Sequence, residues 1–131
     1  MDCFSGGTVS VTQVKKILII ALDGQMSPET QDSDFTAVLE HASHGMEGVV
    51  LNFSRVSVFD SSVFTIVQNA VGALGVMGIP VVWVGLSPGV VCSILDLGLE
   101  SELRAVRSAC TLDEGLALLE RDLRKKQRWS V

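Results

Sequence analysis

Short runs of β-branched residues alternate with segments of helical periodicity, and this alternation limits the folds that the chain can adopt. Strands are expected over residues 8–13, 16–22, 48–53 and 80–84, with an edge strand near 104–108. Helices are expected over 31–43, 61–77 and 88–97, and from Thr111 onward. The pattern predicts an α/β fold, a mixed β-sheet of about four or five strands packed with about four helices in a single pair of layers. The first two strands are too close for a crossover helix, so an antiparallel hairpin is predicted.

The last helix has the clearest start signal in the chain. The sequence T-L-D-E at residues 111–114 is typical of a capping box, with Thr111 as N-cap and Glu114 reaching back to the backbone. Four leucines at helical spacing are expected to form its inner stripe: Leu112, Leu116, Leu119 and Leu123.

Length and charge exclude several classes of protein. A chain of 131 residues is about the size of one domain. The net charge of −5 argues against nucleic-acid binding, which depends on cations placed against phosphates. Residues 1–120 hold five bases against fourteen acids, whereas residues 121–131 hold five bases against one acid. The basic end is typical of a solvated helix terminus, and a membrane or acidic partner is the alternative.

An uncharged stretch, residues 61–95, looks membrane-like at first sight. Glycines and prolines between residues 78 and 89 interrupt it, so no apolar block is long enough to span a bilayer, and membrane association is not expected. Three widely spaced cysteines, Cys3, Cys92 and Cys110, indicate neither a disulfide framework nor a zinc site. The first ten residues lack the pattern of a secretory signal, so a reducing cytoplasm fits best.

One motif imitates a hydrolase. Residues 85–89 read G-L-S-P-G, which matches the G-x-S-x-G nucleophile elbow. Pro88 has no N–H to donate to an oxyanion, and both histidines of the chain lie upstream of Ser87, whereas the elbow arrangement places its histidine last. Ser87 is therefore predicted to cap a helix, and no enzymatic activity is expected.

Metal and cofactor sites are not indicated. His41 and His44 stand three residues apart and could clip a metal, but they fall away from the apolar stripe of their helix and are expected at the surface. Asp23, Asp32 and Asp34 lack the spacing of a calcium loop, and no phosphate-binding glycine loop is present.

The helix expected from Ser61 has an unusual outer face. Its apolar arc holds Val63, Phe64, Ile66, Val67, Ala70, Val71, Leu74 and Met77. The other arc carries no charge and includes glycines that each cost about 1 kcal/mol relative to alanine. Charge depletion is typical of the centre of a protein–protein interface. The predicted partner-binding face comprises Ser62, Phe64, Thr65, Gln68, Asn69, Gly72, Gly75 and Val76.

Ser61 is placed to control such a contact. Asp60 is the expected N-cap of the helix, and Ser61 follows it at the positive end of the helix dipole. A phosphate on Ser61 would add a charge of about −1.5 to −2, which the helix N-terminus tolerates and a neutral partner surface does not. Ser61 is therefore the predicted phosphorylation site, and whether Ser62 or Thr65 accepts a second phosphate stays open.

These residues resemble the STAS domain of bacterial anti-sigma-factor antagonists. The resemblance covers roughly residues 9–123, so the chain is expected to be a single STAS domain over 1–131, with the basic helix end at 121–131. Its most specific part is Asp60-Ser61, which matches the family's Asp-Ser at the start of the second helix. The segments around Val84-Gly85, residues 95–98 and residues 106–109 are most similar to the single-domain scaffold proteins of the stressosome.

The resemblance implies a non-enzymatic, partner-switching regulator of signal transduction in the stress response. Such a protein would bind an anti-sigma-type serine kinase, and phosphorylation of Ser61 would release the kinase. It also implies co-assembly with STAS-containing sensor paralogues in a homo- or hetero-oligomer, and a phosphatase that resets Ser61. The alternative is a STAS subunit of a lipid or anion transport system, in which Ser61 only caps the helix.

Overall fold

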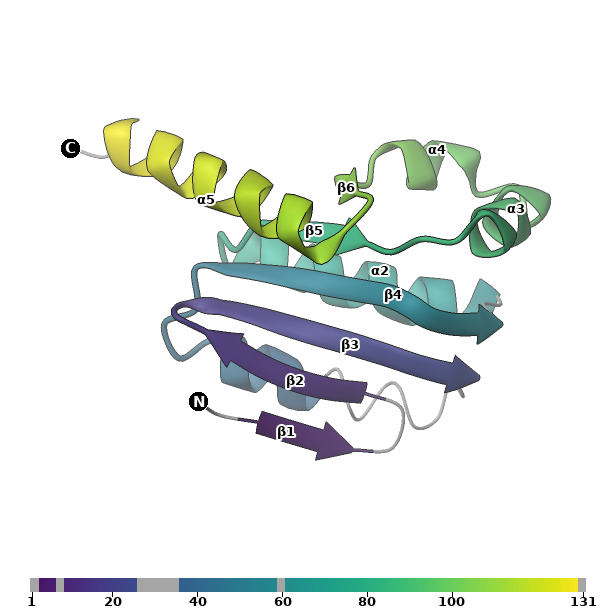
Figure 1. The fold of residues 1–131 in the computed structure, drawn as a ribbon, viewed down its shortest axis with the longest axis horizontal. Coiled ribbons are helices and arrows are strands. Elements are labelled where there is room, and N and C mark those ends of the chain that lie inside the picture. The colour runs from purple at the N-terminus through teal and green to yellow at the C-terminus, as the bar shows by residue number, and fades with distance from the viewer. Residues whose placement is uncertain (1–2, 7–8, 26–35, 59–60, 130–131) are drawn as a thin grey trace.

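The computed structural model describes residues 3–6, 9–25, 36–58 and 61–129 of the chain. These residues form one sheet whose strands follow chain order: β1 (Cys3–Gly6), β2 (Val9–Val14), β3 (Ile17–Gln25), β4 (Gly48–Val58), β5 (Val81–Val84) and β6 (Ser108–Ala109). The helices are a segment over 36–42 and α2 (Ser61–Val76), α3 (Pro88–Asp96), α4 (Glu100–Arg104) and α5 (Leu112–Trp129). Figure 1 shows this arrangement.

The sheet is mixed, as predicted. β1, β2 and β3 pair antiparallel, whereas β3, β4, β5 and β6 pair parallel through helical crossovers. A two-residue turn, Lys15-Lys16, joins β2 to β3, and Lys15 adopts φ 56° within it. The predicted hairpin and the α/β fold class are therefore confirmed.

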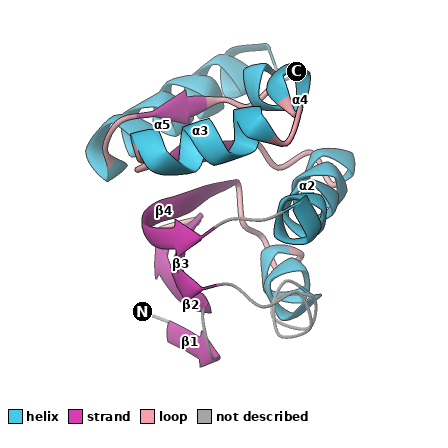
Figure 2. Ribbon diagram, turned by 90° about the vertical axis from the view of Figure 1, so that its right-hand side faces the viewer, coloured by secondary structure: helices cyan, strands magenta, loops and turns pink. Residues whose placement is uncertain are grey.

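Helices cover both faces of the sheet because side chains alternate along the strands. Val49, Leu51 and Trp83 belong to a cluster that includes buried residues of α2 and α3. Val50 and Val82, one position along, belong to a second cluster with α5. Figure 2 shows α2 and the 36–42 helix on one side of the strands. The expected single pair of layers is thus too simple, because α5 packs on the opposite face.

Three aromatic rings lie at the centre of the larger cluster. Trp83 on β5 is 1% exposed, and its ring centroid lies 4.8 Å from that of Phe53 on β4. The centroid of the Phe64 ring on α2 lies 6.1 Å from that of Trp83. Such tilted pairs stabilise the core beyond the effect of the area that the rings bury, so they hold α2 against β4 and β5.

The start of α5 follows its predicted signal closely. Thr111 Oγ1 accepts a hydrogen bond from the Glu114 N–H at 3.2 Å. The Glu114 carboxylate accepts from the Cys110 N–H at 3.3 Å, one residue earlier than a capping box requires. Leu119 is fully buried, and Leu112, Leu116 and Leu123 are partly buried beside it, which confirms the predicted inner stripe.

Several boundaries differ from the prediction. β3 and β4 extend to Gln25 and Val58, because Val56 is buried and pairs with Gly24 beyond a register shift. β1 and the short helix α4 were not predicted. α4 occupies the start of the segment assigned to an edge strand, and that strand, β6, begins only at Ser108. Of the helix predicted over 31–43, residues 36–42 are helical, and residues 31–35 lie outside the described residues.

The approach of α5 to the sheet depends on Gly115. A Cβ atom at this position would lie 2.5 Å from Val84 Cγ1, well inside van der Waals contact. The sequence pattern gave no sign of this requirement, because Gly115 otherwise only weakens the helix.

We predict that Gly115→Ala destabilises the fold although alanine favours helices. Overpacking against Val84 costs about 1–3 kcal/mol, which exceeds the gain of about 1 kcal/mol in helix propensity. Chemical denaturation measures the change in the free energy of unfolding. In a double-mutant cycle, Gly115→Ala should lower the free energy of unfolding less in the Val84→Ala background than in the parent. An equal loss in both backgrounds would contradict the close contact.

Candidate partner-binding site on helix α2

The start of α2 lies at the edge of the sheet where the parallel strands end. β4 ends at Val58 and α2 begins at Ser61, so Ser61 stands at the carboxyl end of the central strand. Ligands of open α/β sheets typically bind outside these strand ends. The structure describes Ser61 and Ser62 as the first helical residues, while their side chains and the predicted cap Asp60 lie outside the described residues.

The inner face of α2 largely matches the predicted apolar arc. Phe64, Val67, Ala70 and Leu74 are each at most 6% exposed, and they lie in the core cluster. Phe64 was also predicted on the partner-binding face, and this prediction is wrong because its ring packs inward toward Trp83. Met77 was predicted inside but is 42% exposed, because the helix ends before it at Val76.

The outer face of α2 is uncharged and largely accessible. Thr65, Asn69, Gly72, Gly75 and Val76 are exposed, and Gln68 is half-buried. Val76 is 91% exposed, the highest value among the large hydrophobic side chains that the structure describes. The absence of charge along this face, rather than the single exposed valine, is what resembles the centre of a protein–protein interface.

Two glycines on this face are not required by the packing of the chain itself. A Cβ atom at Gly72 or Gly75 would meet nothing within 4 Å among the described residues outside the backbone of the helix. By contrast, Gly115 lies tightly against the sheet. The small size of Gly72 and Gly75 therefore serves no purpose visible within the described fold.

A groove runs beside these glycines. It measures about 370 Å³ and lies between Gln68, Gly72 and Gly75 of α2 and the segment around Val106 and Arg107. Its remaining lining residues are Val71, Ile79, Pro80, Val81, Trp83, Glu102 and Ala105. A second hollow of about 300 Å³ shares Gly75, Ile79 and Pro80 with it and reaches Asp122 and Leu123 of α5. The sequence did not reveal this groove, because its walls come from separate segments.

One groove wall is fixed by an ion pair. The Arg107 guanidinium donates two hydrogen bonds to the Asp122 carboxylate on α5, one of them at 3.0 Å. A bidentate pair of this kind holds the segment before β6 against α5. Arg107 thus serves as part of the groove wall rather than as a free cation.

A polar contact within β4 lies beside the turn after β5. Asn52 Oδ1 accepts hydrogen bonds from the Ser54 N–H at 3.0 Å and the Ser54 hydroxyl at 2.7 Å. Gly85 adopts φ +74° beside them, and a Cβ there would lie 2.9 Å from the Ser54 Cβ. Gly85 is therefore a structural requirement of the turn, not part of a nucleophile elbow.

The other candidate residues take structural positions. Ser87 caps α3, with its hydroxyl accepting from the Val90 N–H at 3.2 Å, and Pro88 is the first helical residue, as predicted. His41 Nε2 lies 3.3 Å from Gln13 Oε1, and His44 is exposed beyond the helix. Among the described residues no three potential metal ligands gather, and Asp32 and Asp34 lie outside them. No helix of the described part is long and apolar enough to cross a bilayer.

A model of the STAS domain matches residues 8–113. The chain belongs to the STAS-domain family. No curated protein matched it closely enough to indicate a relative.

Several solved structures share the fold of this STAS domain. RsbS from Moorella thermoacetica, in a variant with glutamate in place of a serine, superposes with a TM-score of 0.77 at 22% identity, over 90% of this chain and 99% of that one. A chain from the molecular architecture of the stressosome gives 0.70 at 25% identity, over 87% and 98%. The anti-sigma factor antagonist SpoIIAA in its unphosphorylated form gives 0.68 at 19% identity, over 86% and 96%. These likenesses show a shared fold.

The open space around the outer glycines of this STAS domain leads to a prediction on stability. Gly72→Ala and Gly75→Ala should each raise the free energy of unfolding by up to about 1 kcal/mol, because alanine favours the helix and meets no neighbour. Urea denaturation of the isolated chain measures the effect. A loss of stability in either variant would show that another part of this chain packs on the face.

Proposed function

We propose that this STAS domain is a non-enzymatic partner-switching regulator, an anti-sigma-factor antagonist of the RsbS-like scaffold type. In this proposal it binds a serine kinase of the anti-sigma type and releases it once Ser61 is phosphorylated. The observation that carries the proposal is the position of Ser61 at the head of a helix whose exposed face is uncharged. The whole chain, residues 1–131, would act as a single STAS domain in the cytoplasm.

The outer face of α2 has the properties that a docking kinase would need. Asn69 offers a polar group, Val76 offers apolar area, and Gly72 and Gly75 let a partner backbone come close. No lysine or glutamate has to be desolvated, because residues 61–76 contain no charged side chain. The groove beside Gly72 extends this surface toward Arg107.

Phosphorylation would act by charge at one end of this face. A phosphoserine at the first turn of α2 accepts hydrogen bonds from free backbone N–H groups and is favoured by the helix dipole. The fold would therefore tolerate the modification. A partner surface that matches an uncharged helix would instead face a charge of about −1.5 to −2, which it must desolvate or expel.

Assembly and reset complete the proposed cycle. The similarity to RsbS and to a stressosome chain supports co-assembly with STAS-containing sensor paralogues. A separate phosphatase would return Ser61 to its unmodified form. Ser62, one residue after Ser61, and Thr65, one helical turn after it, carry the same hydroxyl group and are the candidates for a second phosphate.

We expect phosphate on Ser61 when the protein is incubated with its cognate kinase and ATP, with mass spectrometry to map the site. Ser61→Asp should weaken kinase binding at least about tenfold, a cost of about 1.4 kcal/mol, whereas Ser61→Ala should bind as the parent does and accept no phosphate there. Calorimetric titration gives both affinities.

A matched control uses the other helix-capping serine. Ser87→Ala removes the cap of α3 and should lower stability without changing kinase affinity. If Ser61→Asp binds the kinase with the parental affinity, the proposed switch is refuted. If phosphate is found only on Ser62 or Thr65, the assignment of the switch to Ser61 is wrong.

The glycine face separates docking from folding. Gly72→Gln should leave the fold intact, because open space surrounds position 72, yet should weaken the kinase complex about tenfold or more by blocking close approach. Gly89→Gln, at an equally open position on α3, is the control and should have no effect on affinity. Equal affinity for Gly72→Gln and the parent would place the kinase elsewhere.

A further inference from the structure

The groove beside α2 has an apolar floor that the chain itself leaves partly open. Val71, Val81 and Val106 line the groove and are only partly buried, although each packs against the core cluster. Covering such surface favours association, because apolar area is removed from water. A groove of about 370 Å³ is too small for a whole helix but admits large side chains. The floor is therefore suited to side chains that a partner inserts.

The α2 wall of the groove follows one seam of the helix. Gln68, Gly72 and Gly75 line it at spacings of four and three residues, so they lie on the same face. Helices that pack along each other at a shallow angle use this spacing for their contact seam. A Cβ atom at either glycine would meet open space, which lets a second helix come close. The wall thus fits an α-helix of a partner.

The opposite wall carries one unpaired charge. Glu102 of α4 lines the groove and is exposed. The two bases nearest to it in the sequence are both engaged. Arg104 pairs with Glu100 at 2.6 Å, and Arg107 pairs with Asp122. Among the described residues Glu102 therefore has no ion-pair partner, and it is the one uncompensated charge in the lining of the groove.

We propose that this groove receives an α-helix of the kinase that phosphorylates Ser61, with an apolar side chain in the groove and a lysine or arginine beside Glu102. The inference rests on the proposed function for the identity of the partner, and it names the chemistry that the partner has to bring. Charge complementarity sets the sign of the partner residue, since Arg107 is already neutralised and only Glu102 is left to be matched. A helix with an acid at this point would bring like charges together and would be rejected.

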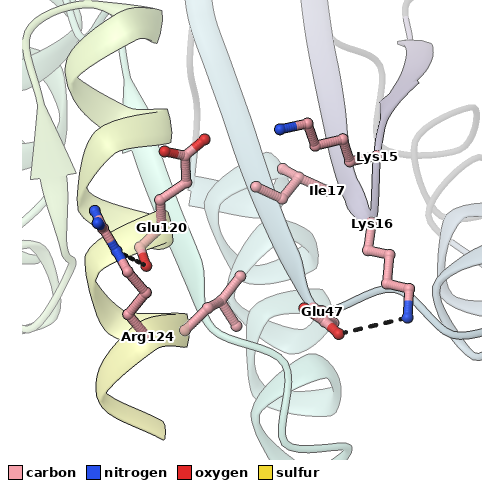
Figure 3. A pocket seen from close by; sticks show the side chains of 7 residues that line it. Lys15, Lys16, Ile17, Glu47, Glu120 and Arg124 are labelled. Atoms are coloured by element: carbon pink, nitrogen blue, oxygen red, sulfur yellow. Dashed lines mark hydrogen bonds and ion pairs between the residues drawn. The ribbon is translucent and has the colours of Figure 1, made fainter. Parts of the chain in front are cut away.

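A separate pocket, of about 580 Å³, offers a matched control. The β2–β3 turn and α5 line it, and Figure 3 shows the side chains of Lys15 and Glu120 on opposite sides of it. Lys16 forms an ion pair with Glu47 at 3.7 Å in the same pocket. Glu120 is an exposed acid that does not line the groove. Glu120→Lys therefore changes the net charge as Glu102→Lys does, but outside the proposed contact.

Calorimetric titration of the kinase with the full-length chain tests the ionic part of the contact. Glu102→Gln should weaken the complex about twofold to fivefold, as the loss of an exposed ion pair does. Glu102→Lys should weaken it at least about tenfold, because two bases then face each other. Glu120→Lys should bind as the parent does. The difference between the parent and Glu102→Gln should shrink at about 0.5 M salt, which a purely structural effect would not show.

Filling the groove tests the apolar part of the contact. Gly75→Leu places an apolar side chain of the chain itself in the open space beside the floor. It should weaken kinase binding at least about tenfold without loss of stability. Gly89→Leu, at an equally open position on α3, is the control and should bind the kinase as the parent does. Circular dichroism checks that every variant is folded.

A charge swap provides the decisive arm. A benzophenone amino acid at Ser101, which is exposed next to Glu102 and outside the lining of the groove, should crosslink to the kinase helix. Mass spectrometry of the crosslinked peptide then gives the nearest lysine or arginine of the kinase. Reversal of that base to glutamate should weaken binding to the parent and restore binding to Glu102→Lys.

The outcomes separate this contact from the phosphate switch. Parental affinity of both Glu102 variants, or a swap that restores nothing, would overturn the proposal while the loss of binding in Ser61→Asp still supported the proposed function. If Glu102→Lys weakens the complex and Ser61→Asp does not, the groove contact stands and the switch fails. A parent that binds no kinase would overturn both.

Discussion

The parallel pairing of β3, β4 and β5 is the constraint on which the rest of the structure depends. Alternate residues of these strands point to opposite faces, so Leu51 and Trp83 pack toward α2 while Val50 and Val82 pack toward α5. Each strand can pass to the next only through a helix that crosses one face. The helix after β4 therefore has to begin at the carboxyl edge of the sheet, and that places Ser61 there.

The same constraint frees the outer face of α2 from any role in the core. The side chains that pack in the core are those of Phe64, Val67, Ala70 and Leu74. The residues on the outer face are not needed for that packing and can contact a partner. Gly115 and Gly72 illustrate the difference. A side chain at 115 would collide with Val84, whereas one at 72 would meet open space, so only the first glycine is explained by the fold. In the proposed account, a partner that docks on α2 explains both the absence of charge along the helix and the glycine at position 72.

Local signals in the sequence predicted the elements whose causes are local. The Thr111 cap and the leucine stripe predicted α5, and Ser87-Pro88 predicted the start of α3. The extension of β4 to Val58 depends on pairing with β3, and the groove depends on three segments meeting around Ile79 and Pro80. Periodicity cannot reveal such causes. Phe64 shows the strength of the helical period instead, since its place on the apolar arc predicted the buried ring and its second assignment, to the partner-binding face, was the error.

The absence of charge on the outer face of α2 is the property on which the proposed switch of this STAS domain depends. The face of α2 is uncharged and is suited to a contact that one phosphate can break. The most direct test of the central claim is calorimetric titration of the kinase against two preparations, one unmodified and one carrying phosphate on Ser61 alone as confirmed by mass spectrometry. The account predicts measurable binding only to the unmodified protein, and equal affinity for both preparations would contradict it.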